Sequence, residues 1–536
     1  MAKNKASVGY AKELPNRTLS VCPECLNIIP ALIFEESGKV WIKKKCPEHG
    51  EFRDLYWGSA EMYKRAKRFA YDGRGVQNPN ITKANPVCPK DCGLCSLHMS
   101  HTALANLVVT NRCDLSCWYC FFFAKRAGYV YEPTLEELRR AVKLLVNERP
   151  VPGNAVQITG GEPSLRDDII EIIKMIKNEG VDHVQYNTNG IRFSQDAEFV
   201  RKVREAGVNT VYLSFDGVTP ETNPKNHYEI PYVLENARKA GNMGIVLVPT
   251  LIKSVNDHEI GDILKFGFRN MDVVRGVNYQ PVSLVGRMPR KEREKFRITI
   301  PDTIEKIEEQ TNGEISKDDF YPVPSVRAIT DFVESIVKKP QYSLSTHFAC
   351  GMATYVFQKD GKMIPITRFV DVEGLFEYLG EKAKELREGK SRYVVGAKML
   401  YKLNSFIDKR RSPEGFSLAK IIYNALMKHD YRALGVFHHK SLFIGMMHFQ
   451  DLYNYDINRV RRCSIHYLTP EAVIPFCAFN VIPEWYRDRV QNKYGISFKK
   501  WESMTGKRLK EEAYKRNVEK LRSSEIYRKT YEDFVK

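Results

Sequence analysis

Six short apolar segments alternate with five longer amphipathic ones between residues 105 and 280. The short segments have the length of buried strands, and the long ones repeat apolar residues every three or four positions, as helices do. Repeated strand–helix units predict a parallel sheet curved into a full or partial barrel, with functional residues at the C-terminal strand ends. The expected strands are 105–110, 155–159, 183–187, 210–215, 244–250 and 276–280, and the expected helices are 134–148, 166–178, 196–206, 231–243 and 257–268.

Three cysteines follow the first expected strand directly, in the sequence Cys113-Asp-Leu-Ser-Cys117-Trp-Tyr-Cys120. Three thiolates on one loop can bind three irons of a [4Fe–4S] cluster, and the fourth iron is then free for a small-molecule ligand. The alternative is a zinc site, but structural zinc sites use four ligands that usually come in C-x2-C pairs. The spacing therefore favours a cluster with one open iron.

Polar motifs close the next three expected strands. Gly160-Gly161-Glu162-Pro163 ends the second strand, Asn187 ends the third, and Ser214-Phe-Asp216 ends the fourth. Glycines let the backbone approach a ligand closely, and carboxylates accept hydrogen bonds from ammonium groups and ribose hydroxyls. Each motif alone is weak, because Gly-Gly-Glu-Pro also fits an ordinary turn. Together with the cysteine loop, they indicate one ligand site along successive strand ends.

These motifs, with the aromatic Tyr119 directly before the last cysteine, resemble the radical SAM superfamily over residues 105–285. The resemblance implies that Cys113, Cys117 and Cys120 hold the catalytic [4Fe–4S] cluster, which cleaves S-adenosylmethionine (SAM) to methionine and a 5′-deoxyadenosyl radical. It also implies a low-potential electron donor such as ferredoxin or flavodoxin. The SAM-binding residues that it implies are Tyr119, Gly160, Gly161, Glu162, Asn187, Ser214 and Asp216.

Residues 18–57 have the features of a small metal-bound module. Cys22-Pro-Glu-Cys25 is one knuckle turn, and Cys46-Pro-Glu-His49 is a second, with a short hairpin expected between them. With His49 or a cysteine from elsewhere as the fourth ligand, the module resembles a rubredoxin-like or zinc-ribbon site for one iron or zinc ion. A structural role is favoured, because so small a module needs a bound metal ion to be stable. Electron relay is the alternative.

The remaining six cysteines form two further groups of three. Cys88, Cys92 and Cys95 repeat the C-x3-C-x2-C spacing and suit an auxiliary [4Fe–4S] cluster, with His98 or His101 as a candidate fourth ligand. A second auxiliary cluster is expected on three cysteines that lie far apart in the sequence, although such residues are often simply small buried hydrophobes. These three are Cys350, Cys463 and Cys477.

The chain is expected to divide into four parts. We predict an N-terminal metal module with its linker, an auxiliary-cluster segment, a partial (β/α)6 radical SAM barrel, and a largely helical C-terminal region that binds the substrate and an auxiliary cluster. A hairpin is expected at residues 354–366 within that last region. The four boundaries are 1–87, 88–104, 105–290 and 291–536.

The net charge of +18 is compatible with nucleic acid, an anionic membrane or an acidic protein partner, as well as with a solvated surface. No recognisable RNA-binding module is present, so no nucleic acid is expected. The polar first residues and the lack of an 18-residue apolar run predict a cytoplasmic protein that is either soluble or peripheral at a membrane.

Beyond the core, the order of the cysteine groups along the whole chain resembles the archaeal tetraether lipid synthase family, which was earlier connected with methylation of a pterin precursor. The resemblance implies that the terminal methyl carbons of two phytanyl chains of a diether phospholipid are coupled by an sp3–sp3 C–C bond. The alternatives are a radical SAM methylase of a small molecule such as a pterin precursor, which predicts a compact polar pocket, and an enzyme that modifies RNA.

Residues 394–485 are rich in apolar and aromatic side chains, which either line a long hydrocarbon tunnel or form an ordinary core. Two groups of basic residues are expected either to meet lipid phosphates or to form solvated faces. These groups are residues 409–411 and the three arginines Arg459, Arg461 and Arg462.

Overall fold

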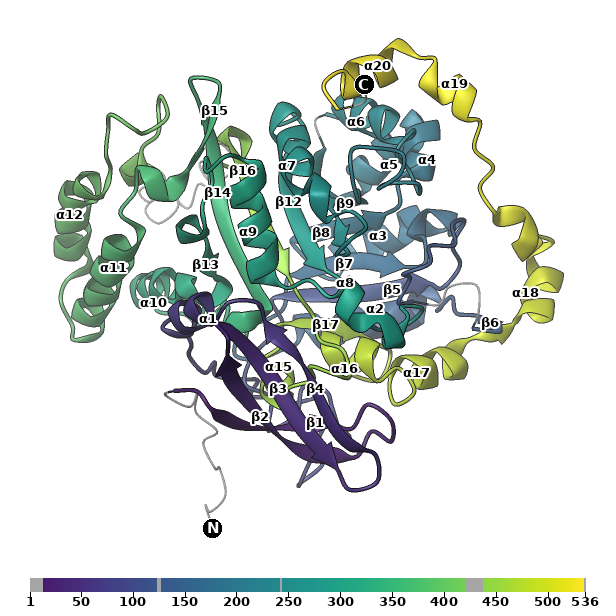
Figure 1. The fold of residues 1–536 in the computed structure, drawn as a ribbon, viewed down its shortest axis with the longest axis horizontal. Helices are drawn as coiled ribbons and strands as arrows, with labels where there is room; N and C mark the ends of the chain where they lie inside the picture. The colour runs from purple at the N-terminus through teal and green to yellow at the C-terminus, as the bar shows by residue number, and fades with distance from the viewer. Residues whose placement is uncertain (1–12, 123–126, 242, 421–436, 535–536) are drawn as a thin grey trace.

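The computed structural model describes residues 13–534 except 123–126, 242 and 421–436 (Figure 1). The first residues, on which the expected localisation partly rested, therefore lie outside the described part of the chain. None of the described helices combines the length and the apolarity needed to cross a membrane.

The centre of the molecule is a thirteen-stranded sheet. Its six core strands lie in sequence order and run parallel, as repeated strand–helix units require. The core strands are β5 (Leu104–Thr110), β7 (Ala155–Gly160), β8 (His183–Thr188), β9 (Thr210–Ser214), β10 (Gly244–Val248) and β12 (Val274–Pro281), and the short β11 (Thr250–Leu251) pairs with β12. The α/β partial barrel that the sequence predicted is confirmed.

Helices between the core strands cover one face of the sheet. Leu138, Val142 and Leu145 of the first of these helices pack on Leu107 and Val109 of β5, in the largest hydrophobic core. The Thr134 side chain caps the same helix, and Glu137 bonds back to the Thr134 backbone in a capping box. The covering helices are α2 (Leu135–Val146), α3 (Ile169–Asn178), α4 (Ile191–Gln195), α5 (Ala197–Ala206), α6 (Ile230–Lys239) and α7 (Ile260–Arg269).

Strands from the C-terminal region extend both edges of this core. β16 pairs in parallel with β12 at one edge, and β17 pairs in parallel with β5 at the other. The expected hairpin is present as β14 and β15, with its turn at Asp360 and Gly361. The added strands are β13 (Tyr321–Pro322), β14 (Gly351–Lys359), β15 (Lys362–Pro365), β16 (Ser441–Met447), β17 (Ile465–Leu468) and β18 (Val473–Pro475).

The rest of the C-terminal region is helical. α10, α11 and α12 surround a small separate core that contains Phe332, Leu375 and Met399. The helices are α8 (Arg293–Phe296), α9 (Ile300–Gln310), α10 (Arg327–Val337), α11 (Val372–Arg387), α12 (Arg392–Leu403), α15 (Ile457–Arg461), α16 (Phe476–Val481), α17 (Arg487–Tyr494), α18 (Phe498–Thr505), α19 (Val518–Arg522) and α20 (Glu525–Tyr531). A separate two-stranded sheet is formed by β6 (Tyr129–Val130) and β19 (Ile496–Ser497). β19 directly precedes α18 in the sequence.

The N-terminal residues form a separate antiparallel sheet, followed by α1 (Ala60–Lys67), below the central sheet in Figure 1. Polar side chains attach this sheet to the C-terminal region. Thr18 and Tyr56 donate to the two carboxylate oxygens of Asp456, which caps α15, and Arg297 bridges Asp54 and Asp451. The strands are β1 (Asn16–Val21), β2 (Ile28–Glu36), β3 (Lys39–Cys46) and β4 (Gly50–Trp57).

Candidate active site and metal centres

The cysteine loop begins directly after β5, at the C-terminal edge of the sheet. Burial raises the pKa of the Cys113 and Cys117 thiols, and a charge on Cys120 raises both further. Arg287 braces the loop from outside, because its guanidinium donates to the Cys117 carbonyl at 2.9 Å and its backbone amide donates to the Cys120 carbonyl at 3.3 Å. Three thiols on one loop with no fourth cysteine beside them suit a cluster with one open iron.

The two glycines at the end of β7 lie against the backbone of this loop. A Cβ on Gly160 would lie 2.1 Å from the Thr110 carbonyl oxygen, and one on Gly161 would lie 2.0 Å from the Arg112 carbonyl oxygen. The amide groups of Gly161 and Glu162 donate to these same two carbonyls. The close approach that the glycines permit is therefore to the cysteine loop itself, which the pair fixes to the second core strand.

Glu162 is completely buried and surrounded by donors from its own chain. Its carboxylate accepts from the Ser164 amide and hydroxyl, from the Thr188 hydroxyl at 2.9 Å and from the Asn189 amide at 2.7 Å. Burial, and then the charge of Asp114, raise the pKa of Glu162 to about 7. Glu162 thus ties the end of β8 to the end of β7 beside the cysteine loop.

Asp216, after β9, belongs to a buried group with Tyr119 and Lys225. The Lys225 ammonium lies 2.7 Å from the Asp216 carboxylate and 3.0 Å from the Tyr119 hydroxyl, which itself donates to Asp216. The Thr250 amide donates to the other carboxylate oxygen at 2.9 Å. Lys225 was missed by the sequence reasoning, because it lies in a polar loop where no pattern distinguishes it from a solvated lysine. The carbonyl of Ser214 accepts from the Asn226 side chain in the same loop.

The end of β8 places two asparagines differently. Asn187 donates to the Thr159 hydroxyl at 3.2 Å, on the sheet face opposite the covering helices. Asn189 reaches the cysteine loop instead, where its side chain donates to the Asp114 carboxylate at 2.6 Å. The sequence predicted Asn187, whereas the structure brings Asn189, which the sequence reasoning missed, to the cysteine loop.

The sheet face opposite the covering helices is polar and partly open. Six of its polar side chains are half-buried although they lie on central strands, whereas the side chains that alternate with them are buried. Gln157 donates to Asn106 at 3.0 Å, and Gln185 bonds the Tyr212 hydroxyl, which faces Tyr355 of β14. The half-buried members of this inner face are Gln157, Gln185, Asn187, Tyr212, Asn278 and Gln280.

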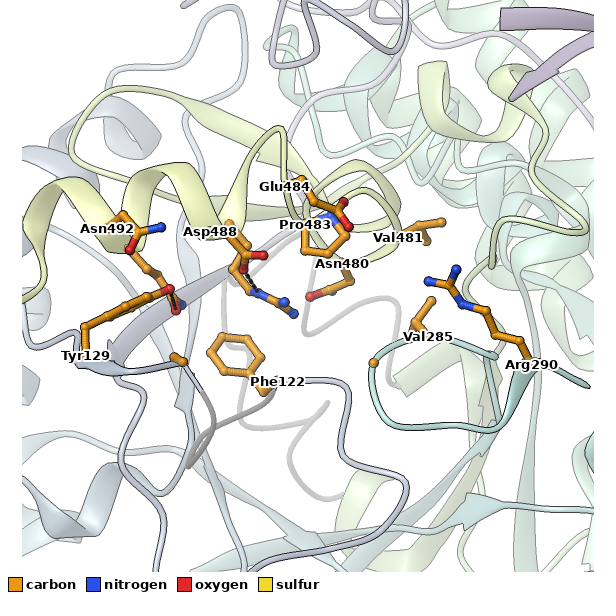
Figure 2. A pocket seen from close by; sticks show the side chains of 14 residues that line it. Phe122, Tyr129, Val285, Arg290, Asn480, Val481, Pro483, Glu484, Asp488 and Asn492 are labelled. Atoms are coloured by element: carbon orange, nitrogen blue, oxygen red, sulfur yellow. Dashed lines mark hydrogen bonds and ion pairs between the residues drawn. The ribbon is translucent and has the colours of Figure 1, made fainter. Parts of the chain in front are cut away.

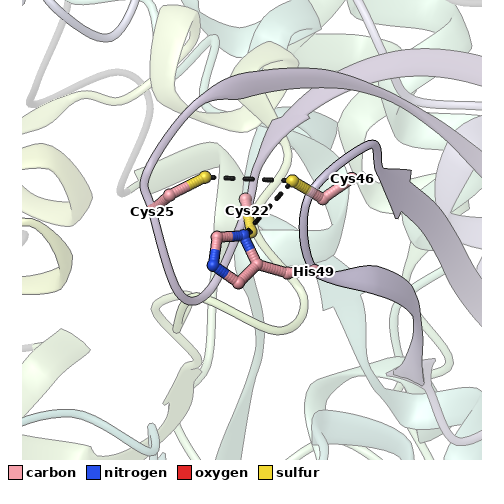
Figure 3. Close-up of side chains that lie close together, drawn as sticks. All are labelled: Cys22, Cys25, Cys46 and His49. Carbon is pink, nitrogen blue, oxygen red and sulfur yellow. Dashed lines mark hydrogen bonds between the residues drawn. The ribbon is translucent and has the colours of Figure 1, made fainter.

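The N-terminal module brings its four expected ligands together (Figure 3). The Cys25 and Cys46 sulfurs lie 3.8 Å apart, and Nδ1 of His49 lies 3.5 Å from the Cys46 sulfur and 3.8 Å from the Cys22 sulfur. A tetrahedral ion with bonds of about 2.3 Å to sulfur and about 2.0 Å to nitrogen needs separations of about 3.8 and 3.5 Å. The donor set therefore fits one metal ion. A hydrogen bond from His49 lowers the pKa of Cys46 to about 6, which favours the thiolate that a metal requires.

The other two cysteine groups meet in one buried region. Cys92 and Cys477 belong to a single hydrophobic cluster, and Cys88, Cys120 and Cys463 pack against it. Burial raises the pKa of Cys463, and charges on Cys477 and Cys350 raise it further, so these three residues are neighbours in the fold. The pKa of Cys92 is raised by a hydrogen bond from Cys88, by burial, and by the charges of Cys95 and Cys463.

Two arginines expected at a lipid headgroup or on a solvated face are buried instead. Arg459 and Arg462 are each 1% exposed, and Arg459 donates to the Cys350 sulfur at 3.3 Å. Contact with lipid phosphates and a place on a solvated face are therefore both wrong for these two residues. Arg459 instead places a positive charge against the Cys350 sulfur. The candidate ligand His98 donates instead to the Cys463 carbonyl at 2.8 Å, and burial lowers its pKa to about 4.

A pocket of about 420 Å³ lies beside the cysteine loop, where Gly286 packs on the backbone that leads to Phe122 (Figure 2). Two arginines, two carboxylates and three carboxamides contribute to its wall. Phe122 and Tyr129 face Asn480 and Asp488 across it. A cavity for a long alkyl chain would be lined mainly by apolar groups, so this wall does not suit one.

The C-terminal tail crosses the loops that hold these residues. Figure 1 shows it as an extended trace from α18 to α19, along the outside of the molecule. Glu512 pairs with Arg112, the Tyr514 amide donates to the Asp114 carbonyl at 3.1 Å, and Arg516 pairs with buried Glu229 at 2.7 Å. Arg516 also donates to the Lys225 carbonyl. The tail therefore ties the cysteine loop to the loop after β9.

Comparison with known proteins agrees with this arrangement. Residues 107–267 match the radical SAM superfamily, and residues 14–58 match the N-terminal zinc ribbon domain of the HMPTM family. The chain is therefore a radical SAM enzyme that uses SAM, a [4Fe–4S] cluster and an electron donor, and its N-terminal module holds a single metal ion.

A 7,8-dihydro-6-hydroxymethylpterin dimethyltransferase of Methanocaldococcus jannaschii is 46% identical over 501 residues, which are 92% of this chain and 98% of that protein. The GTP 3′,8-cyclase of Aquifex aeolicus is 32% identical over 188 residues, which cover 33% of this chain and 56% of the cyclase. A solved methylornithine synthase covers 37% of this chain at 18% identity, with a TM-score of 0.28.

The relative that matches along the whole chain corrects the function expected from the sequence. Coupling of phytanyl chains into tetraether lipids is wrong as the main expectation, because that relative is named for a pterin and not for a lipid. The apolar residues between 394 and 485 agree with the correction, since Met399, Leu442 and Ile444 pack inside hydrophobic cores. The chain belongs to the radical SAM superfamily and, within it, to the family of the 7,8-dihydro-6-hydroxymethylpterin dimethyltransferase of M. jannaschii.

Proposed function

We propose that this enzyme is a radical SAM methylase of a reduced pterin of the 7,8-dihydro-6-hydroxymethylpterin class. The observation that carries the proposal is the 46% identity to the M. jannaschii dimethyltransferase over 92% of this chain. The match extends beyond the radical SAM core, which spans residues 107–267, and so includes the regions that surround the site.

In this proposal Cys113, Cys117 and Cys120 hold the cluster, and bound SAM supplies the carbon radical when the cluster donates an electron. The residues at the neighbouring strand ends hold SAM. Glu162 and Asn189 fix the loop after β8, and the Lys225 ammonium holds the Asp216 carboxylate towards the site. Tyr119 keeps the cysteine loop in contact with Asp216. The remaining proposed SAM contacts are Gly160, Gly161, Asn187 and Ser214.

The chemistry of the inner face supports a polar heterocycle. A reduced pterin carries an amide-like edge with donors and acceptors side by side, and carboxamides offer both kinds of group. Gln157, Gln185 and Asn187 are half-buried there, and the buried Oε1 of Gln185 has no hydrogen-bond partner among the described residues. The aromatic rings of Tyr212 and Tyr355 supply flat surfaces nearby.

The other cysteines are proposed to hold auxiliary [4Fe–4S] clusters. One would use Cys88, Cys92 and Cys95, and the other Cys350, Cys463 and Cys477. Their convergence in one hydrophobic cluster, against which Cys120 also packs, supports electron exchange between the three centres. We keep the four-part division of the chain, at 1–87, 88–104, 105–290 and 291–536, as part of this proposal.

The proposal is tested with anaerobically purified enzyme, SAM and a chemical reductant. We expect 7,8-dihydro-6-hydroxymethylpterin to accelerate the formation of 5′-deoxyadenosine at least tenfold, whereas GTP at the same concentration should not. The Gln185→Leu variant should need more pterin to reach half of its maximal rate, and the Cys117→Ala variant should form no 5′-deoxyadenosine. Equal stimulation by GTP and by the pterin would refute the proposed substrate class.

A further inference from the structure

A tryptophan marks the place where the cysteine loop reaches the surface. Trp118 lies between Cys117 and Tyr119 and is 41% exposed, whereas Tyr119 turns inward to Asp216. One edge of Trp118 packs on Phe296, with the ring centres 5.8 Å apart. An exposed aromatic residue at this position offers an apolar contact surface on the same loop as the three cysteines.

Basic residues lie on the segments that contact Phe296 and the cysteine loop next to Trp118. Lys295 lies over the ring of Phe296 at 5.1 Å, and the backbone amide of exposed Lys253 donates to the Phe296 carbonyl at 3.2 Å. Arg287 holds the Cys117 carbonyl on the other side. Exposed Lys291 precedes α8 and forms no ion pair among the described residues. We call this surface the basic face, and it consists of Trp118, Lys253, Arg287, Lys291 and Lys295.

The acidic groups next to the basic face do not cancel its charge. Glu292 lies 3.5 Å from Lys295 in an exposed pair, and Glu294 is also exposed. Arg293 and Arg297 of the same segment pair with Asp54 behind the surface. Four cations against these two carboxylates leave an excess of two positive charges near one exposed aromatic ring.

We propose that the basic face docks a small acidic electron-transfer protein, which passes one electron to the cluster on the cysteine loop. The donor is oxidised by one electron and the cluster is reduced by one, so no other reactant is needed. A central aromatic anchor with a charged rim is the usual composition of a specific interface, and opposite charges speed the encounter. The inference depends on the radical SAM core and not on the pterin, so it goes beyond the proposed substrate.

The test compares a protein donor with a chemical one. In the Lys291→Glu/Lys295→Glu variant, reduced ferredoxin should support 5′-deoxyadenosine formation with a kcat/KM about tenfold lower than in wild type at low ionic strength, since charge steering changes association rates by about 10 to 1000-fold. With dithionite, which needs no docking, the two proteins should have equal rates. Calorimetry with oxidised ferredoxin should give a Kd at least tenfold weaker for the variant.

The matched control is Lys499→Glu/Lys500→Glu, a reversal of two exposed lysines on α18. This control should bind and use ferredoxin as wild type does. The difference between the first variant and wild type should shrink near 1 M salt, where the Debye length is about 3 Å. An equal loss with dithionite, an equal loss in the control, or unchanged ferredoxin binding in the first variant would each overturn the proposal. Because none of these outcomes requires a pterin, a failure of the proposed substrate remains distinguishable.

Discussion

Replacing Lys225 with methionine removes the ammonium group that pairs with the Asp216 carboxylate. The two atoms lie 2.7 Å apart, and the side chains are 9% and 4% exposed. Methionine keeps most of the apolar length of the lysine side chain, so the substitution chiefly deletes the charge. Asp216 keeps its bonds from the Tyr119 hydroxyl and the Thr250 amide.

The magnitude follows from this geometry. At an effective dielectric constant of about 20, two unit charges 2.7 Å apart attract each other by about 6 kcal/mol, and the desolvation of both groups offsets part of that attraction. Breaking a buried pair by removing one partner typically costs about 3–5 kcal/mol. Because Asp216 retains two donors, we expect the lower end, a loss of about 3 kcal/mol in the free energy of unfolding, and at least tenfold weaker SAM binding.

Urea unfolding and equilibrium binding of SAM to the reconstituted enzyme measure these two effects. The matched control is Lys239→Met, because Lys239 pairs with Glu235 at 3.4 Å on an exposed helix face. Such a pair contributes only about 0.3–0.5 kcal/mol. In a double-mutant cycle, Asp216→Asn should lose much of its effect when Lys225 is already methionine. A loss below 1 kcal/mol for Lys225→Met, with unchanged SAM affinity, would refute the role assigned to this pair.

Three further predictions concern the metal module, the glutamate and the glycine pair. The Cys46→Ser variant should lack the N-terminal metal and melt at a lower temperature, because metal binding is coupled to folding, and metal analysis with calorimetry checks both. The pKa of Glu162 is raised to about 7, so the stability of wild type relative to Glu162→Gln should fall as pH rises from 4.5 to 7, by about 3 kcal/mol in urea titrations. A Cβ in Gly161→Ala would lie 2.0 Å from the Arg112 carbonyl, so we expect a displaced cysteine loop and less cluster iron per chain. Wild-type iron content in that variant, or no pH dependence in the Glu162 comparison, would contradict the respective argument.

The core strands could be predicted because each is a short, largely apolar run bounded by turn residues and separated from the next by at least one helix. The observed β7 (Ala155–Gly160) and β8 (His183–Thr188) differ from the expected ranges by one residue. β16 (Ser441–Met447) could not be predicted, because a seven-residue apolar run also fits a buried helix segment and its partner β12 lies far away in the sequence.

The candidate site was predictable where residues follow a strand directly, as Cys113 follows β5. It was not predictable where a side chain comes from a long loop, as Lys225 does. It was also not predictable which of two nearby residues of the same type, Asn187 or Asn189, contacts the cysteine loop. The burial of Arg459 could not be predicted either, because a sequence with three arginines close together is typical of a solvated surface. Only the structure shows that Arg459 contacts Cys350.

The substrate expected from the sequence failed for a different reason. Apolar composition is shared by tunnels and by ordinary cores, and Met399 and Ile444 pack within cores. The polar side chains of the inner face come from strand positions such as Gln157 and Gln185, whose alternation with buried residues becomes clear only when the sheet is known.

The transfer of deuterium from a labelled pterin into 5′-deoxyadenosine tests the central claim most directly. The enzyme is incubated with SAM, a reductant and 7,8-dihydro-6-hydroxymethylpterin that carries deuterium on its carbon-bound positions, and the nucleoside is analysed by mass spectrometry. If the radical made at the cysteine loop acts on a reduced pterin, 5′-deoxyadenosine gains one deuterium, and the Cys113→Ala variant forms none. Pterin-dependent SAM cleavage that leaves the nucleoside unlabelled would contradict the account.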